Sequence, residues 1–262
     1  MLNFKALIGT HDVYLITLDS LRFDVAQETP LFGLRKHFAA WEKRHSPASF
    51  TYAAHHAFFA GFLPTPATPG RHPRPFAAQF QGSETTHPHT FVFEEATLPA
   101  ALAARGYCTV CIGGVGFFNQ QTALGKVFPD MFQHSFWTRD MGVTSRHSPR
   151  AQVKKALEVL DGFPATQRMF LFMNFSATHK PTHIFHPDHR TDSIETQKSA
   201  LEAIEPHLMQ LFEHQEKRGP ALVIITSDHG EAFGEDGFHG HRLGHETVWT
   251  VPYAEFLLGE PL

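Results

Sequence analysis

The chain has 262 residues, enough for one substantial α/β domain, and its 42% apolar and 18% charged residues are ordinary for a globular protein. Its formal net charge of −4 supplies no basic field, which argues against nucleic acid and anionic membranes as partners. The sequence has no signal-peptide pattern and no apolar run long enough to cross a bilayer, so we expect a cytoplasmic protein. The 20 histidines favour a metal site without locating it.

Apolar segments rich in β-branched and aromatic residues predict strands buried on both faces, and they alternate with segments of helical periodicity. The predicted strands cover residues 12–18, 107–112, 169–175, 221–226 and 253–258. The predicted helices cover residues 95–105, 150–160 and 195–217, and Pro206 is expected to kink or split the last one. This order predicts a three-layer α/β/α sandwich with a mostly parallel central sheet, formed by a single domain over residues 1–262.

Two segments rich in Pro, Gly and His interrupt this alternation. They run from Leu63 to Pro88 and from Thr178 to Asp192. Their composition predicts long surface loops over the sheet, where binding groups usually lie.

Two short motifs suggest cofactor chemistry that the wider sequence does not support. Cys108 and Cys111 have CxxC spacing, but in a strand they point to opposite faces, and no second CxxC completes a zinc site. We therefore interpret them as packed thiols. Gly113-Gly-Val-Gly116 follows a strand like a nucleotide loop, yet it lacks the lysine of a P-loop. Close packing of the backbone near the edge of the sheet that is expected to carry the site explains these glycines equally well.

Acidic residues follow two of the predicted buried strands. Asp19 comes directly after residues 12–18, and Asp228 and His229 come just after residues 221–226. Ligands bind at the carboxyl ends of strands in an open parallel sheet, so these side chains are expected to converge. Two converging carboxylates repel each other unless a cation lies between them, which indicates a divalent metal. The alternative is that each Asp merely caps a following helix.

Two segments carry a family resemblance that spans nearly the whole chain. Val13-Tyr-Leu-Ile-Thr-Leu-Asp-Ser-Leu-Arg22 resembles the opening strand of the sulfatase and phosphodiesterase branch of the alkaline phosphatase superfamily. Thr226-Ser-Asp-His-Gly-Glu-Ala-Phe-Gly-Glu235 resembles that branch's second metal motif, and Val251-Pro252 precedes the expected last strand. The resemblance implies an alkaline phosphatase-like fold and a metal-dependent hydrolase or transferase.

The family's nucleophile lies at the start of a helix. The segment from Thr51 to Pro64 resembles the Thr-Phe-Pro-x-His…Gly-x-x-Pro segment of nucleotide phosphodiesterases, which implies that Thr51 is both nucleophile and metal ligand. A helix N-terminus also offers N–H groups to phosphoryl oxygens. A plain N-cap is the alternative role for Thr51, and Ser46 and Ser49 are the fallback nucleophiles.

The chain departs from true sulfatases in its nucleophile and in its metal ligands. No Cys/Ser-x-Pro-x-Arg motif is present, which argues against a formylglycine enzyme. Calcium-type sulfatases have a second Asp and an Asn where this chain has Ser20 and His229. An imidazole ligand favours zinc or manganese over calcium.

A second metal is a weaker expectation that rests on His179 and His239, which resemble the family's mid-chain and late histidines. Phosphodiesterases carry an Asp four residues before the mid-chain histidine, where this chain has Phe175. The two histidines could hold a second zinc, bind the ester oxygens, or lie in loops without a role.

Four further residues are lesser candidates: Arg22, Lys180, His183 and His245. The first three could neutralise charge on the ester, although Arg22 could instead pair with Asp24. His245 resembles the histidine before Val-Pro that some superfamily members use as a metal ligand, and it ranks below His239.

These inferences predict an enzyme with one divalent metal, zinc or manganese, held by Asp19, Thr51, Asp228 and His229, with a second metal as an open option. Its substrate is expected to be a phosphate- or sulfate-type ester, small or carried on a peptide. The peptide option follows from a resemblance to compact sulfatase-like proteins found beside radical-SAM peptide-maturation enzymes. The alternative is a catalytically weak metal-binding partner in a peptide-maturation complex. A phosphomutase is disfavoured because the chain is short. The sequence leaves the oligomeric state open.

Overall fold

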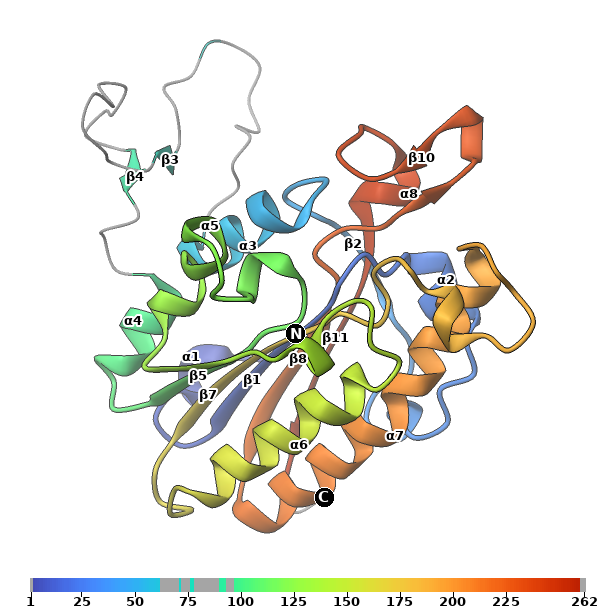
Figure 1. The fold of residues 1–262 in the computed structure, drawn as a ribbon. Coiled ribbons are helices and arrows are strands. Elements are labelled where there is room, and N and C mark those ends of the chain that lie inside the picture. Colours follow the sequence, from blue (N-terminus) through green and yellow to red (C-terminus); the bar gives the residue numbers. More distant parts are fainter. Residues whose placement is uncertain (1, 62–70, 72–75, 78–89, 93–96, 260–262) are drawn as a thin grey trace.

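The computed structural model describes residues 2–61, 71, 76–77, 90–92 and 97–259. A seven-stranded sheet with the order β2-β11-β8-β1-β7-β5-β6 forms its centre (Figure 1). All pairings from β8 to β6 are parallel, whereas β11 runs antiparallel to both β8 and β2. The strands are β1 (Asp12–Leu18), β2 (Glu42–His45), β5 (Cys108–Ile112), β6 (His134–Phe136), β7 (Met169–Phe175), β8 (Ala221–Thr226) and β11 (Thr250–Leu258).

Strand β1 lies between β7 and β8, and all seven of its residues are buried. Its side chains alternate between two cores: Tyr14, Ile16 and Leu18 enter one, and Val13 and Leu15 enter the other. A strand covered on both faces is mostly apolar, which is why residues 13–16 and 18 are apolar without a polar alternation.

Helices cover both faces of this sheet, and Figure 1 shows α6 and α7 lying together across one of them. Val153 and Leu160 of α6 and Leu208 of α7 pack on the same core as Tyr14 of β1. Phe59 of α3 and Leu102 of α4 pack on the opposite core. The helices are α1 (Phe4–Leu7), α2 (Phe23–Glu28), α3 (Thr51–Ala60), α4 (Leu98–Ala103), α5 (Ala123–Lys126), α6 (Ser148–Asp161), α7 (Ile194–Arg218) and α8 (Glu246–Trp249).

Several short strands and 3₁₀ turns lie between the main helices and strands. The two-residue strands are β3 (Phe76–Ala77), β4 (Phe91–Val92), β9 (Ala232–Phe233) and β10 (His239–Gly240). The 3₁₀ turns are η1 (Leu34–Lys36), η2 (Gly116–Phe118), η3 (Pro129–Met131), η4 (Arg139–Met141), η5 (His183–Phe185) and η6 (Glu235–Gly237).

This architecture confirms the predicted three-layer fold and corrects several details. The helix α7 continues from Ile194 to Arg218 with Pro206 inside it, so the predicted split does not occur. The polar edge strand β2 and the three-residue β6 were not predicted, because neither shows an apolar run. The helix predicted from residue 95 begins at Leu98 within the described residues, with Thr97 as its N-cap. The predicted loop over residues 63–88 lies outside the described residues except for residue 71 and β3.

The two cysteines point to opposite faces of β5, as their strand position predicts. Cys108 belongs to the core under α6 and α7, and Cys111 belongs to the other core. Both are free thiols, and burial raises the pKa of each one.

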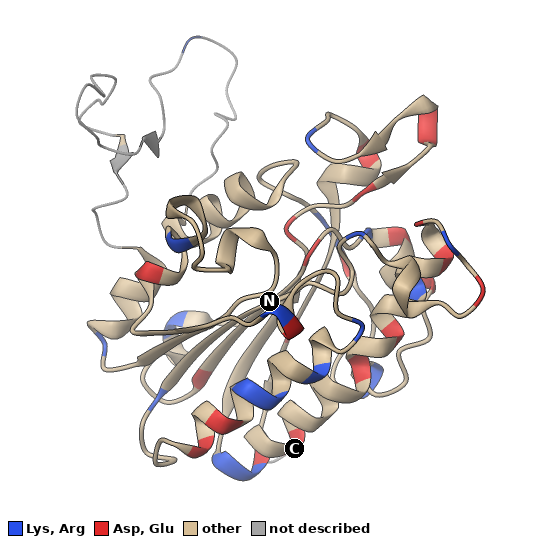
Figure 2. Cartoon of the chain, in the orientation of Figure 1, with Lys and Arg blue, Asp and Glu red and all other residues tan. Residues whose placement is uncertain are grey.

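Basic and acidic residues are interspersed along the outer faces of α6 and α7 (Figure 2). Glu158 pairs with Lys154 at 3.8 Å and also with Lys155. Water and salt screen exposed pairs of this kind, so they contribute little to stability. Among the described residues, no helix is both long and apolar enough to cross a membrane.

Candidate metal centre

Two carboxylates and one imidazole lie close together at the carboxyl ends of β1 and β8. Asp19 follows β1, and Asp228 and His229 follow β8, its neighbour in the sheet. One ligand atom from each lies within 4.8 Å of the others, and all three side chains are fully buried. The predicted convergence therefore occurs. The helix-capping alternative fails for Asp19, since no side chain caps α2.

The two carboxylates are held by a turn that has a strained residue at its centre. Ser20 has a φ of 63°, a left-handed conformation that costs a non-glycine residue about 1–2 kcal/mol. The turn allows its N–H to donate to Asp228 Oδ1 at 3.1 Å and its hydroxyl to donate to Asp19 Oδ1 at 3.1 Å. Asp228 Oδ1 also accepts the N–H of His229 at 3.0 Å. Its Oδ2 is buried and has no hydrogen-bond partner in the described part of the chain.

Burial makes both carboxylates costly as anions. It raises the pKa of Asp228 to about 6. Burial, followed by the charge of Asp228, raises the pKa of Asp19. Two acidic groups that are pushed toward their neutral forms in one dry pocket would be stabilised by a cation between them.

The imidazole of His229 turns a lone pair toward these carboxylates. Its Nδ1–H donates to the carbonyl of Gly230 at 2.8 Å, so Nε2 is the acceptor of the neutral ring. Burial lowers the pKa of His229 to about 4, which keeps the ring neutral near pH 7. Nε2 lies 3.5 Å from Asp228 Oδ2 and 3.9 Å from Asp19 Oδ1. A histidine whose other nitrogen donates to a backbone carbonyl is typical of a metal ligand.

Thr51 brings a hydroxyl to the same point. Its Oγ1 lies 3.2 Å from His229 Nε2, and the side chain is 2% exposed. Thr51 is the first residue of α3, with Phe50 at the N-cap and no side-chain cap, so the alternative N-cap role is excluded. Of the fallback nucleophiles, Ser46 has its hydroxyl within hydrogen-bonding distance of the carbonyl oxygens of Ala48 and Asp228, either of which can accept its proton.

The donor set fits one divalent cation of the zinc or manganese type. Asp19, Thr51, Asp228 and His229 offer three oxygens and one nitrogen. Ligand atoms about 2.0–2.2 Å from a tetrahedral zinc lie roughly 3.3–3.6 Å apart. The separations of His229 Nε2 from the other three ligands, 3.2, 3.5 and 3.9 Å, are close to that range. The unpaired Asp228 Oδ2 is the observation that a cation explains best.

The late histidine nearest to this cluster is His241, which the sequence analysis did not select. The His241 ring lies 4.5 Å from the His229 ring and 5.7 Å from the His179 ring. Its Nδ1 is bound at 2.6 Å by the buried carboxylate of Glu231. The predicted candidate His239 is exposed on β10, where it pairs with Phe233.

His179 lies beside the cluster, as its position after β7 predicts. It contributes to the electrostatic field at Asp19 and Asp228, and its Nδ1 bonds to the carbonyl of Lys180 at 2.6 Å. Phe175, which replaces the family's Asp, is fully buried in the core. Its side chain therefore cannot serve a second metal.

The structure gives the lesser candidates other partners. Arg22 binds Asp24, the alternative that the sequence suggested, and also pairs with Glu235. Lys180 Nζ binds Glu231 Oε1 at 2.9 Å, so it shares that carboxylate with His241. His183 pairs with Asp192 at 2.8 Å in the loop after β7. None of these pairs includes a member of the cluster.

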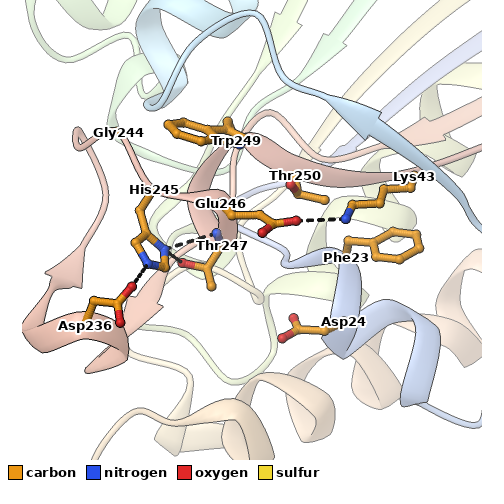
Figure 3. Close-up of a pocket in the computed structure, with 10 residues that line it drawn as sticks. All are labelled: Phe23, Asp24, Lys43, Asp236, Gly244, His245, Glu246, Thr247, Trp249 and Thr250. Atoms are coloured by element: carbon orange, nitrogen blue, oxygen red, sulfur yellow. Dashed lines mark hydrogen bonds and ion pairs between the residues drawn. The ribbon is translucent and has the colours of Figure 1, made fainter.

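His245 lines a separate pocket and is not part of the candidate metal site. The pocket has a volume of about 480 Å³ and is bordered by α2, β2 and α8 (Figure 3). His245 bonds to Asp236 at 3.1 Å and caps α8 by accepting from the N–H of Thr247 at 3.2 Å. Glu246 faces Lys43 across the same pocket at 2.9 Å. These partners explain His245 as a structural residue of this loop.

The chain belongs to the Sulfatase family, which it matches over residues 44–254. It therefore has the fold of a sulfatase-family catalytic domain. No curated protein matches the sequence.

Solved structures with the same fold include three transferase domains. The C-terminal periplasmic domain of phosphoethanolamine transferase EptC from Campylobacter jejuni has a TM-score of 0.62 at 14% identity, over 94% of this chain and 79% of that one. The soluble domain of lipooligosaccharide phosphoethanolamine transferase A from Neisseria meningitidis has a TM-score of 0.66 at 14% identity, over 95% and 78%. The C-terminal periplasmic domain of EptC from Escherichia coli, in complex with Zn, has a TM-score of 0.62 at 14% identity, over 94% and 72%.

Proposed function

We propose that this chain cleaves or transfers a phosphate-type ester, with Thr51 as the nucleophile and one zinc or manganese ion held by Asp19, Thr51, Asp228 and His229. The observation that carries the proposal is the 3.2 Å contact between Thr51 Oγ1 and His229 Nε2, beside the unpaired Asp228 Oδ2. A zinc complex of a structure with the same fold supports the choice of metal. A bound divalent cation would lower the pKa of a coordinated hydroxyl and offset charge on phosphoryl oxygens.

The position of Thr51 suits in-line attack on an ester held at the start of α3. The first N–H groups of this ten-residue helix receive no side-chain cap and can bind the equatorial oxygens of a phosphoryl group. Thr51 would lose its hydroxyl proton to water, and its Oγ1 would form a bond to phosphorus as the bond to the leaving oxygen breaks. The leaving oxygen would keep the electron pair and take up a proton to become an alcohol. Water or an acceptor alcohol would then attack the threonyl ester and release Thr51.

His179 and His241 would interact with the oxygens of the ester. Glu231 binds Nδ1 of His241, and the centroid of the His241 ring lies 4.5 Å from that of the His229 ring. From there the two imidazoles can hold a phosphoryl oxygen or protonate the leaving alcohol. This proposal gives the role expected for His239 to its neighbour His241. The proposed reaction uses one metal, because a second site would lack the carboxylate that the family has in place of Phe175.

The test is metal analysis followed by turnover of generic esters. Metal-stripped protein would be reconstituted with zinc or manganese and assayed on 4-nitrophenyl phosphate, bis(4-nitrophenyl) phosphate and 4-nitrophenyl sulfate. Thr51→Ala should lower kcat by about 10³-fold or more, while Thr51→Ser keeps part of it and the matched control Ser49→Ala keeps nearly all.

Each outcome separates the proposal from its rival. Full turnover in Thr51→Ala would remove Thr51 as the nucleophile. Bound metal without turnover of any ester would favour the metal-binding partner in a peptide-maturation complex. Protein that binds neither metal would exclude both functions.

A further inference from the structure

The buried side chain of Asn174 contacts the proposed metal site but is not one of its proposed ligands. Asn174 is the next-to-last residue of β7, opposite Thr17 of β1, and it is fully buried. Its Nδ2 donates to Asp19 Oδ2 at 3.0 Å and to Thr17 Oγ1 at 3.2 Å. Asp19 therefore receives a hydrogen bond on the oxygen that Ser20 does not bind.

The orientation of the Asn174 amide is fixed by a donor on its other side. The backbone N–H of Val115 donates to Asn174 Oδ1 at 3.0 Å. Because an N–H can only donate, Oδ1 must face Val115, and Nδ2 must face Asp19. The amide cannot flip without losing a hydrogen bond at each end, and a lost bond costs more in a dry interior.

The loop after β5 reaches Asn174 only because residue 114 is glycine. A Cβ on Gly114 would lie 2.1 Å from the carbonyl oxygen of Asn174 and 2.9 Å from its Oδ1. Gln152 of α6 ties the two segments together, since its Nε2 donates to the carbonyls of Gly113 at 3.1 Å and Asn174 at 2.6 Å. The Gly113-Gly-Val-Gly116 motif thus serves a close approach between the loop and β7.

From Thr17 the hydrogen bonds continue to the helix that carries Thr51. Thr17 Oγ1 lies 3.1 Å from His55 Nε2, and His55 Nδ1 lies 2.8 Å from the carbonyl oxygen of Thr51. A carbonyl only accepts, so Nδ1 carries the proton of His55 and Nε2 accepts from the Thr17 hydroxyl. Thr17 and His55 are buried, and aromatic rings surround His55, including Phe118 at 5.1 Å and Phe172 at 5.6 Å.

We infer that Asn174 is a positioning residue: it holds Asp19 in its metal-binding orientation and, through Thr17 and His55, joins that carboxylate to the start of α3. The inference rests on the proposed metal site. The backbone groups at the two ends, the N–H of Val115 and the carbonyl of Thr51, fix which atoms donate and which accept in this series of hydrogen bonds, and every side chain from Asn174 to His55 is buried. A partner of this kind fixes a ligand before the ion binds, and its loss typically lowers metal affinity 10–100-fold.

The first experiment measures zinc binding by metal-stripped protein in competition with a chromophoric chelator. Asn174→Leu, which keeps the size but removes both hydrogen-bonding ends, should weaken zinc binding by about 10–100-fold. The matched control is Gln215→Leu. Gln215 is also a fully buried amide, and its Nε2 binds Asp12 Oδ2 at 3.1 Å at the opposite end of β1. That control should lower the melting temperature and leave zinc affinity unchanged.

A second variant keeps the side-chain volume and removes only the hydrogen bonds that lead from Asn174 toward α3. Thr17→Val keeps the Asn174–Asp19 hydrogen bond and removes the acceptor and donor between Asn174 and His55. Zinc affinity should stay within about threefold, while kcat on the ester that the wild type cleaves falls about tenfold or more at similar KM.

The outcomes distinguish this inference from the proposed function. A folded Asn174→Leu variant with wild-type zinc affinity would overturn the positioning of Asp19. An unchanged kcat in Thr17→Val would overturn the link to Thr51. Wild-type protein that binds no zinc would overturn the metal site and the positioning role together, whereas zinc binding without turnover would remove only the proposed reaction. Should Asn174→Leu not fold, Asn174→Ala takes its place in the same titration, with the same two readings.

Discussion

Nε2 of His229 lies 3.5 Å from Oδ2 of Asp228, and in the neutral ring and the ionised carboxylate neither atom has a proton to offer the other. Both atoms are fully buried, and Oδ2 has no hydrogen-bond partner among the described residues. Nε2 can still accept the Thr51 hydroxyl at 3.2 Å, whereas the ionised Oδ2 faces the Nε2 lone pair with no donor, which destabilises the metal-free fold. A cation between them would convert this repulsion into binding energy.

The first prediction is that Asp228→Asn stabilises the metal-free protein and abolishes tight zinc binding. The amide keeps the oxygen that accepts from Ser20 and His229, and its new N–H₂ can donate to His229 Nε2. We expect the free energy of unfolding in EDTA to rise by about 1–3 kcal/mol, measured by urea denaturation. Added zinc should stabilise the wild type and have no effect on the variant.

The matched control for this substitution is Asp236→Asn, which makes the same chemical change on an exposed carboxylate. Within the part of the chain that the structure describes, the ion-pair partner of Asp236 is His245, in the pocket of Figure 3, so its variant should remain within about 0.5 kcal/mol of the wild type. A metal-free Asp228→Asn protein less stable than the wild type would contradict the repulsion between Asp228 and His229.

The second prediction concerns the pH dependence of zinc affinity. Burial raises the pKa of Asp228 to about 6, so below that pH the metal-free protein carries a proton that zinc must displace. His229 does not compete above about pH 4, because burial lowers its pKa to that value. From this proton alone, apparent affinity should change little above pH 7 and should approach a tenfold fall per pH unit below pH 6.

Calorimetry in buffers of different ionisation enthalpy checks this through the protons released per zinc bound. Near pH 5 Asp228 should release about one proton, and near pH 8 its contribution should vanish. An affinity that is the same at pH 5 and pH 8 would show that Asp228 is ionised without the metal.

The ligands could be predicted from sequence because a parallel sheet brings the ends of adjacent strands together. Asp19 and Asp228 follow strands that the apolar runs identify, and β1 and β8 are neighbours. Thr51 depended on the family resemblance, since a helix-initiating threonine is common. The same apolar runs predicted the three layers, whereas β2 gives no such signal because all its residues are polar.

The groups around these ligands could not be predicted, because tertiary contacts select them. Gly240 has a φ of 91°, so the simple alternation of a strand does not apply between His239 and His241. The buried Glu231 then binds His241. Asn174 gave no signal inside an apolar strand, and its role depends on a loop that approaches from β5.

The third prediction is that Glu231→Gln lowers kcat about 10–100-fold and leaves zinc affinity within about threefold. Burial acts to raise the pKa of Glu231, but its bonds to His241 and Lys180 outweigh this and lower the pKa, so it is a carboxylate. The neutral amide would orient His241 less firmly and release Lys180. Glu246→Gln, which changes an exposed carboxylate bonded to Lys43, is the control and should be close to the wild type. Equal losses of zinc affinity and of kcat would instead place Glu231 among the groups that build the metal site.

The last prediction separates the glycines of the Gly113-Gly-Val-Gly116 motif. A Cβ at Gly114 would lie 2.1 Å from the carbonyl oxygen of Asn174, which is backbone and cannot move aside. Gly114→Ala should therefore push the loop off β7, remove the Val115 hydrogen bond to Asn174, and lower the free energy of unfolding by about 1–3 kcal/mol. Gly116→Ala is the control from the same motif, because a Cβ there meets only Asn119 at 4.0 Å. Zinc affinity should fall in the first variant and not in the second. If the two variants bind zinc equally well, the loop has no part in holding Asn174. The glycines of this motif would then be required only for the conformation of the loop itself.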